Sequence, residues 1–493
     1  MNRMLTFGGL RGEYHSHWPE WSALSLYAAL VAFAIPYHEP FSDEAQAWQL
    51  ARCLSLPALF QNYIRYEGSP GLWHFLLWIM VRAHVSYAGL HWICGAIALG
   101  ATALLLFKSP FPRYLKLALP FTFFLLFQYA VVARSYVLMP LLLYLIALSW
   151  KKSPLILALL LGLLANVELH ATVISGALAV VYVIEIVRNR GERKSYHWHQ
   201  LLWSAGILLG FWAFAVWTAL PPPDLNKYLA TRVGASWPLF MVRTSASVLW
   251  PVCQPWILSI PFWIAIALCL RARHSLFYLF PVLLFAIFCG AAAHGWWHLG
   301  IVVPLLICIL WITWPASGGI VYRSEAAARI ALIAMVSAQI LWSAFAIEYD
   351  HYNAYSPDLA TAEFLRPFVR QGATIAVTYL DDPGAETFRV FGILPYYDHD
   401  IFMNVPNLFW SWSNQNQTEK MFLEVLPSHP TLIIVETQPY YSDVPIHLES
   451  SKIELLNRSG YKFTNMFCGA MPMRFELQEK SCHLIFQRDD ALQ

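Results

Sequence analysis

Two adjacent carboxylates, Asp43 and Glu44, follow the first long apolar stretch of the chain. A carboxylate can take the proton from a hydroxyl nucleophile, and it can also bind a divalent metal ion. The same pair can serve helix structure, because an oxygen of Ser42 or Asp43 could accept free N–H groups at the start of a helix running to about Phe60. Helix physics alone favours this capping interpretation.

The loop that begins with the acidic pair contains further groups suited to a charged ligand. Arg65, Tyr66 and Glu67 precede Gly68-Ser69-Pro70, so a guanidinium, an aromatic ring and another carboxylate occur in one short segment. More such residues fall between other apolar stretches, namely Arg134, Tyr136, Glu168, His170, His294 and His298. Ionisable groups beside the hydrocarbon region cost free energy unless they are paired or functional. Their number favours a reaction site over capping alone.

The elements that must position these groups are membrane-spanning helices. Only 13% of the 493 residues are charged, compared with about 25% in soluble domains. A helix needs roughly 20 apolar residues to cross a bilayer. Uncharged runs of this kind occur at 21–37, 117–133, 201–220, 277–293 and 299–314. Such a series excludes a single signal peptide. The net charge of +2 argues neither for nor against nucleic acid, because the basic residues are spread among loops; we expect no nucleic-acid partner.

Lysine and arginine in the short loops set the orientation, because cytoplasmic loops are rich in these residues. Basic clusters alternate with loops that are poorer in them, and the clusters lie at 108–116, 151–152, 188–194, 271–273 and 323–329. Placing all of them in the cytoplasm predicts crossings near 21–37, 117–133, 136–150, 154–167, 170–187, 200–220, 256–270, 276–293, 299–314 and 327–347.

The segment after the first loop contains two apolar stretches, 70–81 and 88–107, although the charge pattern permits a single net crossing there. The first stretch could lie along the interface, which suits its Trp73 and Trp78. Its status stays open at this stage. The fold class is therefore a polytopic α-helical membrane protein with about eleven crossings. The N-terminus is expected in the cytoplasm and the loop 38–70 on the opposite side.

A second, extracytoplasmic domain is predicted for residues 349–493, after a transmembrane domain of residues 1–348. This tail contains many charged residues together with short β-branched runs, such as Thr374–Thr378 and Thr431–Val435. These runs alternate with helical stretches such as Leu359–Val369, a pattern that indicates a small α/β domain. We expect it to lie outside the membrane and to contribute to recognition of an acceptor.

The eight cysteines form no CxxC pair and no metal-ligand pattern. Four of them lie in apolar runs, where cysteine is a small hydrophobic residue: Cys94, Cys269, Cys289 and Cys308. Cys468 and Cys482 lie in the polar tail and could form a disulfide if that tail is extracytoplasmic. The sequence leaves open whether they are bonded.

Three segments together resemble the GT-C glycosyltransferases. They are Asp43-Glu44 just after the first span, a loop helix followed by Tyr66-Glu67-Gly68-Ser69-Pro70, and the turn Ala133-Arg134-Ser135-Tyr136. The chain is most similar to protein O-mannosyltransferases and lipid A aminoarabinose transferases, over residues 20–190 in motif order. The resemblance implies a GT-C-like fold and a polyprenyl-phosphate sugar donor. A bacterial inner membrane is the expected location, and the sequence leaves open whether the outer compartment is a bacterial periplasm or an organelle lumen.

The resemblance also implies roles for the first-loop residues. Asp43 would be the general base or a metal ligand, Glu44 would support it, and Glu67 would lie close to the donor phosphate. Arg65 or Arg134 would bind that phosphate, since relatives use a basic residue for it.

One departure from the family concerns a second acid. Many relatives have an aspartate shortly after the turn in which this chain reads Tyr136-Val137-Leu138-Met139-Pro140. Glu168 is the only nearby carboxylate that could replace it.

A divalent metal ion is a candidate cofactor, with Asp43, His294 and His298 as candidate ligands. The two histidines are four residues apart and would share one face of a helix. A Trp-rich interface segment explains the same stretch equally well. His170 could bind phosphate or metal, or could bond a carbonyl at a helix end.

The function that these residues predict is transfer of a sugar from a polyprenyl-phosphate carrier to an extracytoplasmic hydroxyl. The acceptor would be a glycan, a lipid or a protein. One alternative is a transporter or flippase of lipid-linked glycans, although no internal repeat is evident. Another is an assembly protein that has the fold but no catalytic activity.

Overall fold

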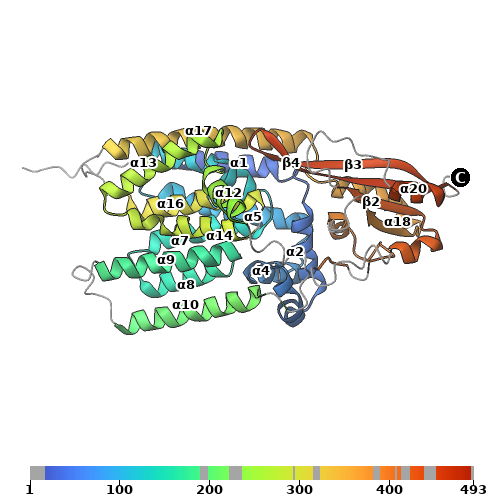
Figure 1. Cartoon of the computed structure of the whole chain (residues 1–493), viewed down its shortest axis with the longest axis horizontal. Coiled ribbons are helices and arrows are strands. Elements are labelled where there is room, and N and C mark those ends of the chain that lie inside the picture. Colours follow the sequence, from blue (N-terminus) through green and yellow to red (C-terminus); the bar gives the residue numbers. More distant parts are fainter. Residues whose placement is uncertain are drawn as a thin grey trace, which may run out of the picture.

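The computed structural model describes residues 17–188, 198–220, 222, 236–292, 295–314, 323–380, 389–405, 408–411, 422–437 and 451–489. A long helical bundle occupies the left of Figure 1, and a small domain built on a four-stranded sheet lies to its right. The end of the bundle beside this domain is called the sheet end, and the opposite end is called the far end.

Within the described residues, five helical segments are long and apolar enough to cross a membrane, so the chain is a helical membrane protein. They are α5 (Tyr87–Lys108), α9 (Leu169–Arg188), α10 (Trp198–Ala219), α15 with α16 (Trp296–Leu299 and Val302–Thr313) and α17 (Arg323–Tyr352). Shorter helices pack among them, namely α1 (Trp18–Ala34), α7 (Leu138–Ser149), α8 (Pro154–Ala165), α13 (Ser259–Ala272) and α14 (Phe280–Ala291). Each of these helices overlaps a predicted crossing or the apolar stretch 88–107.

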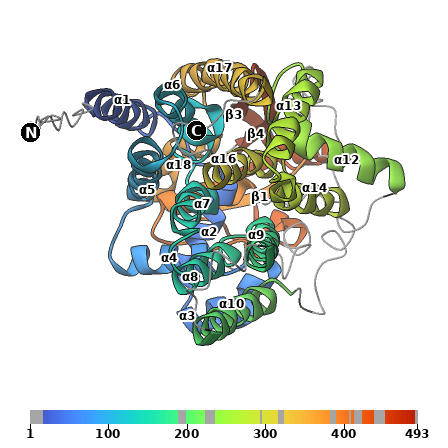
Figure 2. The ribbon, with the colours of Figure 1, turned by 90° about the vertical axis from the view of Figure 1, so that its left-hand side faces the viewer.

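The burial of the side chains of a helix agrees with its position in the bundle, as α16 and α10 show. Helix α16 is buried from Val302 to Ile312 and lies near the centre in Figure 2. Helix α10 lies at the edge of the same view and exposes large apolar side chains such as Trp203 and Leu209. Large exposed apolar side chains are unfavourable in water but suit contact with lipid.

The predicted crossing at 117–133 is not one continuous helix. The chain forms α6 (Arg113–Ala118), the short helix η3 (Leu119–Phe121) and a second short helix η4 (Phe124–Gln128). Pro120 lacks the N–H that an uninterrupted helix requires. Thr122 then adopts an extended backbone, and its hydroxyl donates a hydrogen bond to the carbonyl of Leu119. The break is stabilised by side-chain bonding inside the bundle.

Two helices lie in regions that the charge pattern leaves undecided or treats as loop. Helix α4 (Leu72–Arg82) has 11 residues, which span only about 16 Å and cannot cross a bilayer. It packs against the loop helix α2 (Ser42–Cys53). Helix α12 (Trp237–Leu249) occupies part of a predicted loop and packs on α14. The apolar positions of α12 are spaced for a helix, but none of its runs is long enough to span.

Helix α2 is shorter than predicted and is capped differently. It ends at Cys53, after which Ser55 caps the short helix α3 (Leu56–Ala58). Its N-cap is Phe41, whose N–H donates to Glu44 Oε1 at 2.8 Å. The expectation that Ser42 or Asp43 caps this helix is therefore wrong. Because Glu44 does the capping, the carboxylate of Asp43 is available for another partner.

The sheet of the C-terminal domain has the order β1-β2-β4-β3. Strand β1 (Ile375–Tyr379) pairs in parallel with β2 (Leu432–Thr437), close to the two predicted β-branched runs. Strands β3 (Tyr461–Met473) and β4 (Glu476–Arg488) form a long antiparallel hairpin beside β2. Alternate residues of β2 face two separate cores, one under α18 (Asp358–Arg370) and one under α20 (Ser451–Arg458). Burial on both faces explains why β2 is apolar without alternation.

The C-terminal domain is joined to the bundle at several places. Helix α17 continues through the predicted domain boundary at residue 348 and ends at Tyr352. The tip of the β3–β4 hairpin returns to the bundle along α17 (Figure 1), and the guanidinium of Arg474 lies 3.8 Å from the ring of Trp250. Cys468 and Cys482 lie opposite each other in the hairpin and form a disulfide.

Candidate functional site

Asp43 and Arg134 form an ion pair at the sheet end of the bundle. Asp43 is in the first turn of α2, and Arg134 immediately precedes the short helix η5 (Ser135–Val137). Arg134 Nη1 donates to Asp43 Oδ2, and the two side chains are 22% and 19% exposed. A pair with this exposure can be reached by a ligand, because neither group is enclosed on every side.

Aromatic rings hold the guanidinium of Arg134 in place. It lies 5.4 Å from the ring centroid of Tyr136 and 5.5 Å from that of Trp297. Trp297 is fixed in turn, since its carbonyl accepts a hydrogen bond of 2.7 Å from Tyr129 Oη. Cation–π contacts of this kind restrict the orientation of a guanidinium while leaving its N–H groups free to bind oxygen ligands.

A group of one carboxylate and two imidazoles lies next to this pair. Glu168 is in the turn before α9, His170 is in the first turn of α9, and His298 is in α15. Glu168 Oε1 is 2.7 Å from His170 Nδ1 and 3.2 Å from His298 Nε2. The ring of Tyr136 lies 5.5 Å from that of His298 and so connects the two groups. Six predicted site residues thus form one continuous set, called the Arg134 cluster: Asp43, Arg134, Tyr136, Glu168, His170 and His298.

Glu44 belongs to a different set of residues, called the Glu44 network: His38, Glu44, His91 and Asp350. Glu44 Oε2 accepts hydrogen bonds from the backbone N–H of Ala133 at 2.6 Å and from His91 Nε2 at 3.0 Å. His38 Nε2 is 3.5 Å from the other oxygen, and His38 Nδ1 is 3.1 Å from Asp350 Oδ2. The carboxylate of Glu44 therefore has a partner at each oxygen.

The charges of the Glu44 network stabilise one another. Burial alone would raise the pKa of Glu44, but bonding to His38 and His91 outweighs burial and holds that pKa far below its ordinary value. Burial alone would lower the pKa of His38, but Asp350 and Glu44 raise it to about 10. The network is an enclosed set of paired charges that links the loop, α2, α5 and α17. Its geometry suits a structural role for Glu44 and leaves no oxygen for a substrate.

Glu67 lies close to Asp43 on the other side of the loop. Gln46 Nε2 donates to Glu67 Oε2 at 2.8 Å, while Glu67 Oε1 is buried without a hydrogen-bond partner among the described residues. Burial first, and then the negative charge of Asp43, raise the pKa of Glu67 to about 8. Glu67 is thus protonated at neutral pH and can donate a hydrogen bond, which a carboxylate cannot do.

The remaining predicted site residues lie apart from the Arg134 cluster or outside the described part of the chain. Arg65 Nε donates to the carbonyl of Leu220 at 3.0 Å, so its guanidinium is directed toward the end of α10. Tyr66 is half-buried in the short helix η2 (Ile64–Tyr66) next to it. His294 lies outside the described residues, so the structure does not address its predicted role as a metal ligand.

Three residues of the Glu44 network were not predicted as part of any site. His91 has the clearest signal, because it is a titratable residue inside an apolar run. His38 directly precedes Glu39 and was grouped with the acidic segment without a role. Asp350 is separated from His38 by 312 positions in the chain. No spacing rule connects residues so far apart, and only packing of α17 against α1 brings them together.

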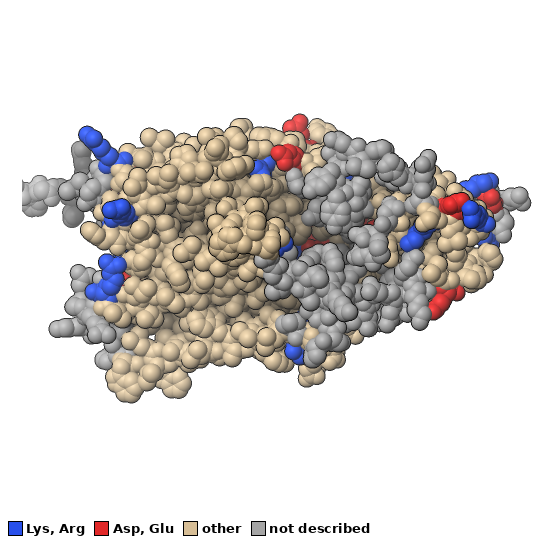
Figure 3. Space-filling model, viewed as in Figure 1, with Lys and Arg blue, Asp and Glu red and all other residues tan. Residues whose placement is uncertain are grey.

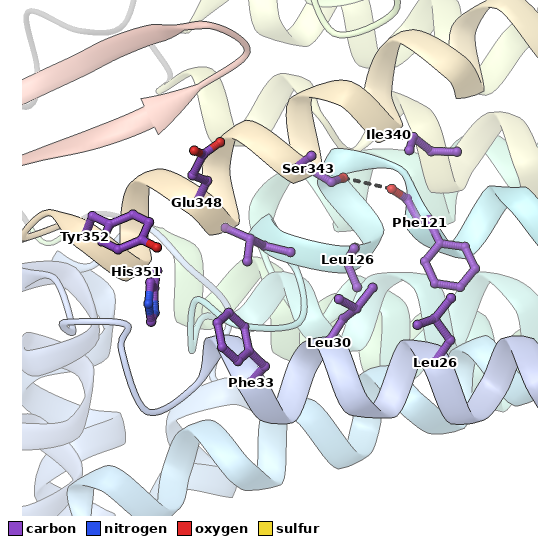
Figure 4. A pocket seen from close by; sticks show the side chains of 12 residues that line it. Leu26, Leu30, Phe33, Phe121, Leu126, Ile340, Ser343, Glu348, His351 and Tyr352 are labelled. Atoms are coloured by element: carbon purple, nitrogen blue, oxygen red, sulfur yellow. Dashed lines mark hydrogen bonds between the residues drawn. The ribbon is translucent and has the colours of Figure 1, made fainter.

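An apolar groove with a volume of about 620 Å³ lies between α1 and α17. Figure 4 shows Leu26, Leu30 and Phe33 on one side of it, with Ile340 and Ser343 on the other. The more polar residues Glu348, His351 and Tyr352 lie along the part of α17 nearest the sheet end. The groove suits a hydrocarbon chain, and its lining includes no member of the Arg134 cluster.

Comparison of the chain with protein-family models, with curated proteins and with solved structures found no match.

Proposed function

We propose that the protein is a GT-C-like membrane glycosyltransferase that uses a polyprenyl-phosphate sugar donor. The observation that carries this proposal is the Asp43–Arg134 pair, a carboxylate and a fixed guanidinium together at one end of an apolar bundle. A lipid phosphate presents its head group at a bilayer surface, where one end of a membrane-spanning bundle would lie. The pair supplies the two functions that such a transfer needs, namely a base for the acceptor and a positive charge for the departing phosphate.

The bundle is proposed to have about eleven crossings, with the sheet end facing away from the cytoplasm. Exposed basic residues gather at the far end (Figure 3). Lys108, Lys151, Lys152, Arg188 and Arg271 are exposed, and each lies at or next to a helix end. Cytoplasmic loops are the ones rich in lysine and arginine. The disulfide between Cys468 and Cys482 supports the same orientation, since disulfides persist in oxidising compartments. A bacterial inner membrane, with the N-terminus in the cytoplasm, fits both observations.

The proposed reaction has one bond-forming and one bond-breaking step. The acceptor hydroxyl oxygen bonds to the anomeric carbon while Asp43 takes the hydroxyl proton. The bond from the anomeric carbon to the phosphate oxygen breaks, and the polyprenyl phosphate leaves with the electron pair. Arg134 stabilises the charge that grows on this phosphate. Donor binding would draw Arg134 toward the phosphate and so release Asp43 to act as the base.

The C-terminal domain is proposed to bring the acceptor to this centre. It contacts α2 directly, because Arg52 Nη2 donates to the carbonyl of Tyr397 and Gln49 Nε2 to that of Leu408, each at 2.8 Å. Asp43 is in the first turn of the same helix. An acceptor held between the domain and α2 would therefore lie beside the proposed base.

The test is sugar transfer by purified Asp43→Asn in vesicles supplied with polyprenyl-phosphate sugars. The variant keeps the size of the side chain but removes the base, so transfer should fall by about 10²- to 10⁴-fold. Glu454→Gln is the matched control, because Glu454 is exposed and pairs with its neighbour Arg458 on the surface of the C-terminal domain. Transfer by Asp43→Asn at the rate of the control would contradict the proposal, provided that both variants are folded.

A further inference from the structure

We infer that Glu168, His170 and His298 bind a zinc ion through three side-chain ligands and leave its fourth position open. Carboxylate oxygen and imidazole nitrogen are the ligands that zinc takes in sites of this type. The inference concerns metal binding alone and does not depend on the transfer reaction proposed above.

The spacing of the three groups fits a tetrahedral ion. Their ligand atoms all lie within 4.8 Å of one another. Two ligands at about 2.0 to 2.1 Å from zinc are separated by roughly 3.3 Å in a tetrahedron. Glu168 Oε1 and His298 Nε2 are already 3.2 Å apart. His170 Nδ1 is 2.7 Å from the same oxygen, so a small side-chain rotation brings the third ligand into place.

The second nitrogen of His298 contacts the backbone of Gly295. The N–H of Gly295 donates to His298 Nδ1 at 3.0 Å, and the carbonyl oxygen of Gly295 lies 3.2 Å from the same nitrogen. This contact orients the ring so that Nε2 faces Glu168. A histidine that binds metal through Nε2 carries its proton on Nδ1, so zinc binding would move the His298 proton to Nδ1 and exchange the bond from the Gly295 N–H for a bond to the Gly295 carbonyl.

A buried oxygen without a partner provides an independent reason for a ligand at this place. Glu168 is 6% exposed, and its Oε2 has no hydrogen-bond partner among the described residues. A buried carboxylate oxygen without a partner is costly. A cation bound by Glu168 would offset the cost of burying this oxygen.

The Glu44 network contains the same residue types but is closed to a metal ion. His38, Glu44 and His91 also bring their ligand atoms within 4.8 Å of one another. Backbone N–H groups of Phe41 and Ala133, however, donate to the two oxygens of Glu44. A cation in that place would have to displace these donors, so composition alone does not select a zinc site.

Zinc in this position would extend the positive charge of Arg134 toward Glu168. One carboxylate and two neutral imidazoles leave a zinc site with a net charge of +1, which attracts an anionic oxygen to the open position. The charge of Arg134 interacts with that of Glu168. Inorganic phosphate is therefore the expected class of fourth ligand, and water is the ligand when phosphate is absent.

The experiment measures metal content and spectra of the full chain in detergent, without any sugar donor. After chelation and equilibration with Zn²⁺, elemental analysis should find about one zinc per chain, as a site with three protein ligands and one open position implies. Co²⁺ in its place should give the visible absorption bands of a tetrahedral site. His298→Ala and Glu168→Gln should each weaken binding by more than the roughly 10- to 100-fold that loss of a second-shell partner costs. His399→Ala, an exposed histidine of the C-terminal domain, is the matched control.

Two results would overturn the inference. One is a wild-type chain that takes up no stoichiometric zinc and gives no cobalt spectrum. The other is zinc bound equally well by His298→Ala, Glu168→Gln and the control. Glu168→Asp keeps a carboxylate and tests the site if Glu168→Gln fails to fold, because it should retain zinc with lower affinity.

Discussion

The molecule contains two groups of two histidines and one glutamate, and they differ in how the carboxylate is satisfied. In the Glu44 network, backbone donors and both histidines occupy the oxygens of Glu44, and Asp350 closes the far side of His38. In the Arg134 cluster, one oxygen of Glu168 receives both histidines and the other has no hydrogen-bond partner among the described residues. The first arrangement holds four parts of the chain together, and the second leaves capacity for a ligand.

Residue type and burial therefore do not identify a functional site by themselves. Five of the six side chains are buried, and His298 is half-buried. What distinguishes them is the count of hydrogen-bond partners at each carboxylate oxygen, which decides whether a substrate or ion can bind without breaking existing bonds. The acidic pair Asp43-Glu44 illustrates the point, because Asp43 is paired with Arg134 in the Arg134 cluster whereas Glu44 belongs to the Glu44 network.

The largest expected effect is the loss of thermal stability that follows substitution of Glu44. Glu44→Gln leaves His38 and His91 without their carboxylate partner, and removal of one member of a buried charge network costs about 3 to 5 kcal/mol. The midpoint of thermal denaturation in detergent should fall markedly for Glu44→Gln and stay within experimental error for Glu454→Gln. Glu168→Gln in metal-free protein should lie between them. A Glu44→Gln protein as stable as the wild type would contradict a structural role for the network.

A smaller effect is expected at Glu67, and it depends on pH. Folding raises the pKa of Glu67 from 4.5 to about 8. Between these values the folded chain keeps the proton while the unfolded chain loses it, so the free energy of unfolding falls as the pH rises. Glu67→Gln is neutral throughout and should lose this part of the decline. Thermal denaturation from about pH 5 to 8 tests the difference, and parallel curves for the two proteins would argue against a protonated Glu67.

The sequence was informative where local rules apply. Uncharged runs located the helices because a segment in lipid must be apolar along its whole length. Thr374–Thr378 and Thr431–Val435 predicted the edge strand β1 and the central strand β2 from β-branched residues alone. The grouping of Asp43, Arg134 and His298 followed from placing all loops of one side together, which topology permits without a three-dimensional structure.

Other features depend on contacts that no local pattern records. The helix break at Pro120 is stabilised by packing within the bundle. The position of the short helix α4 depends on its contact with α2. The role of Glu44 required its bonds to His91 and Ala133, which come from distant segments. The long β3–β4 hairpin contacts the bundle where Arg474 lies over the ring of Trp250. Nothing in the sequence around Arg474 distinguishes it from other basic residues of a polar tail.

Arg134 is proposed to bind the phosphate of a lipid carrier at the sheet end. A structure of the chain in lipid nanodiscs with bound polyprenyl phosphate tests it most directly. We expect a phosphate oxygen about 2.7 to 2.9 Å from the guanidinium of Arg134, with Asp43 released from its ion pair. A phosphate bound instead at the Glu348 and His351 end of the α1–α17 groove, with the Asp43–Arg134 pair intact, would contradict it.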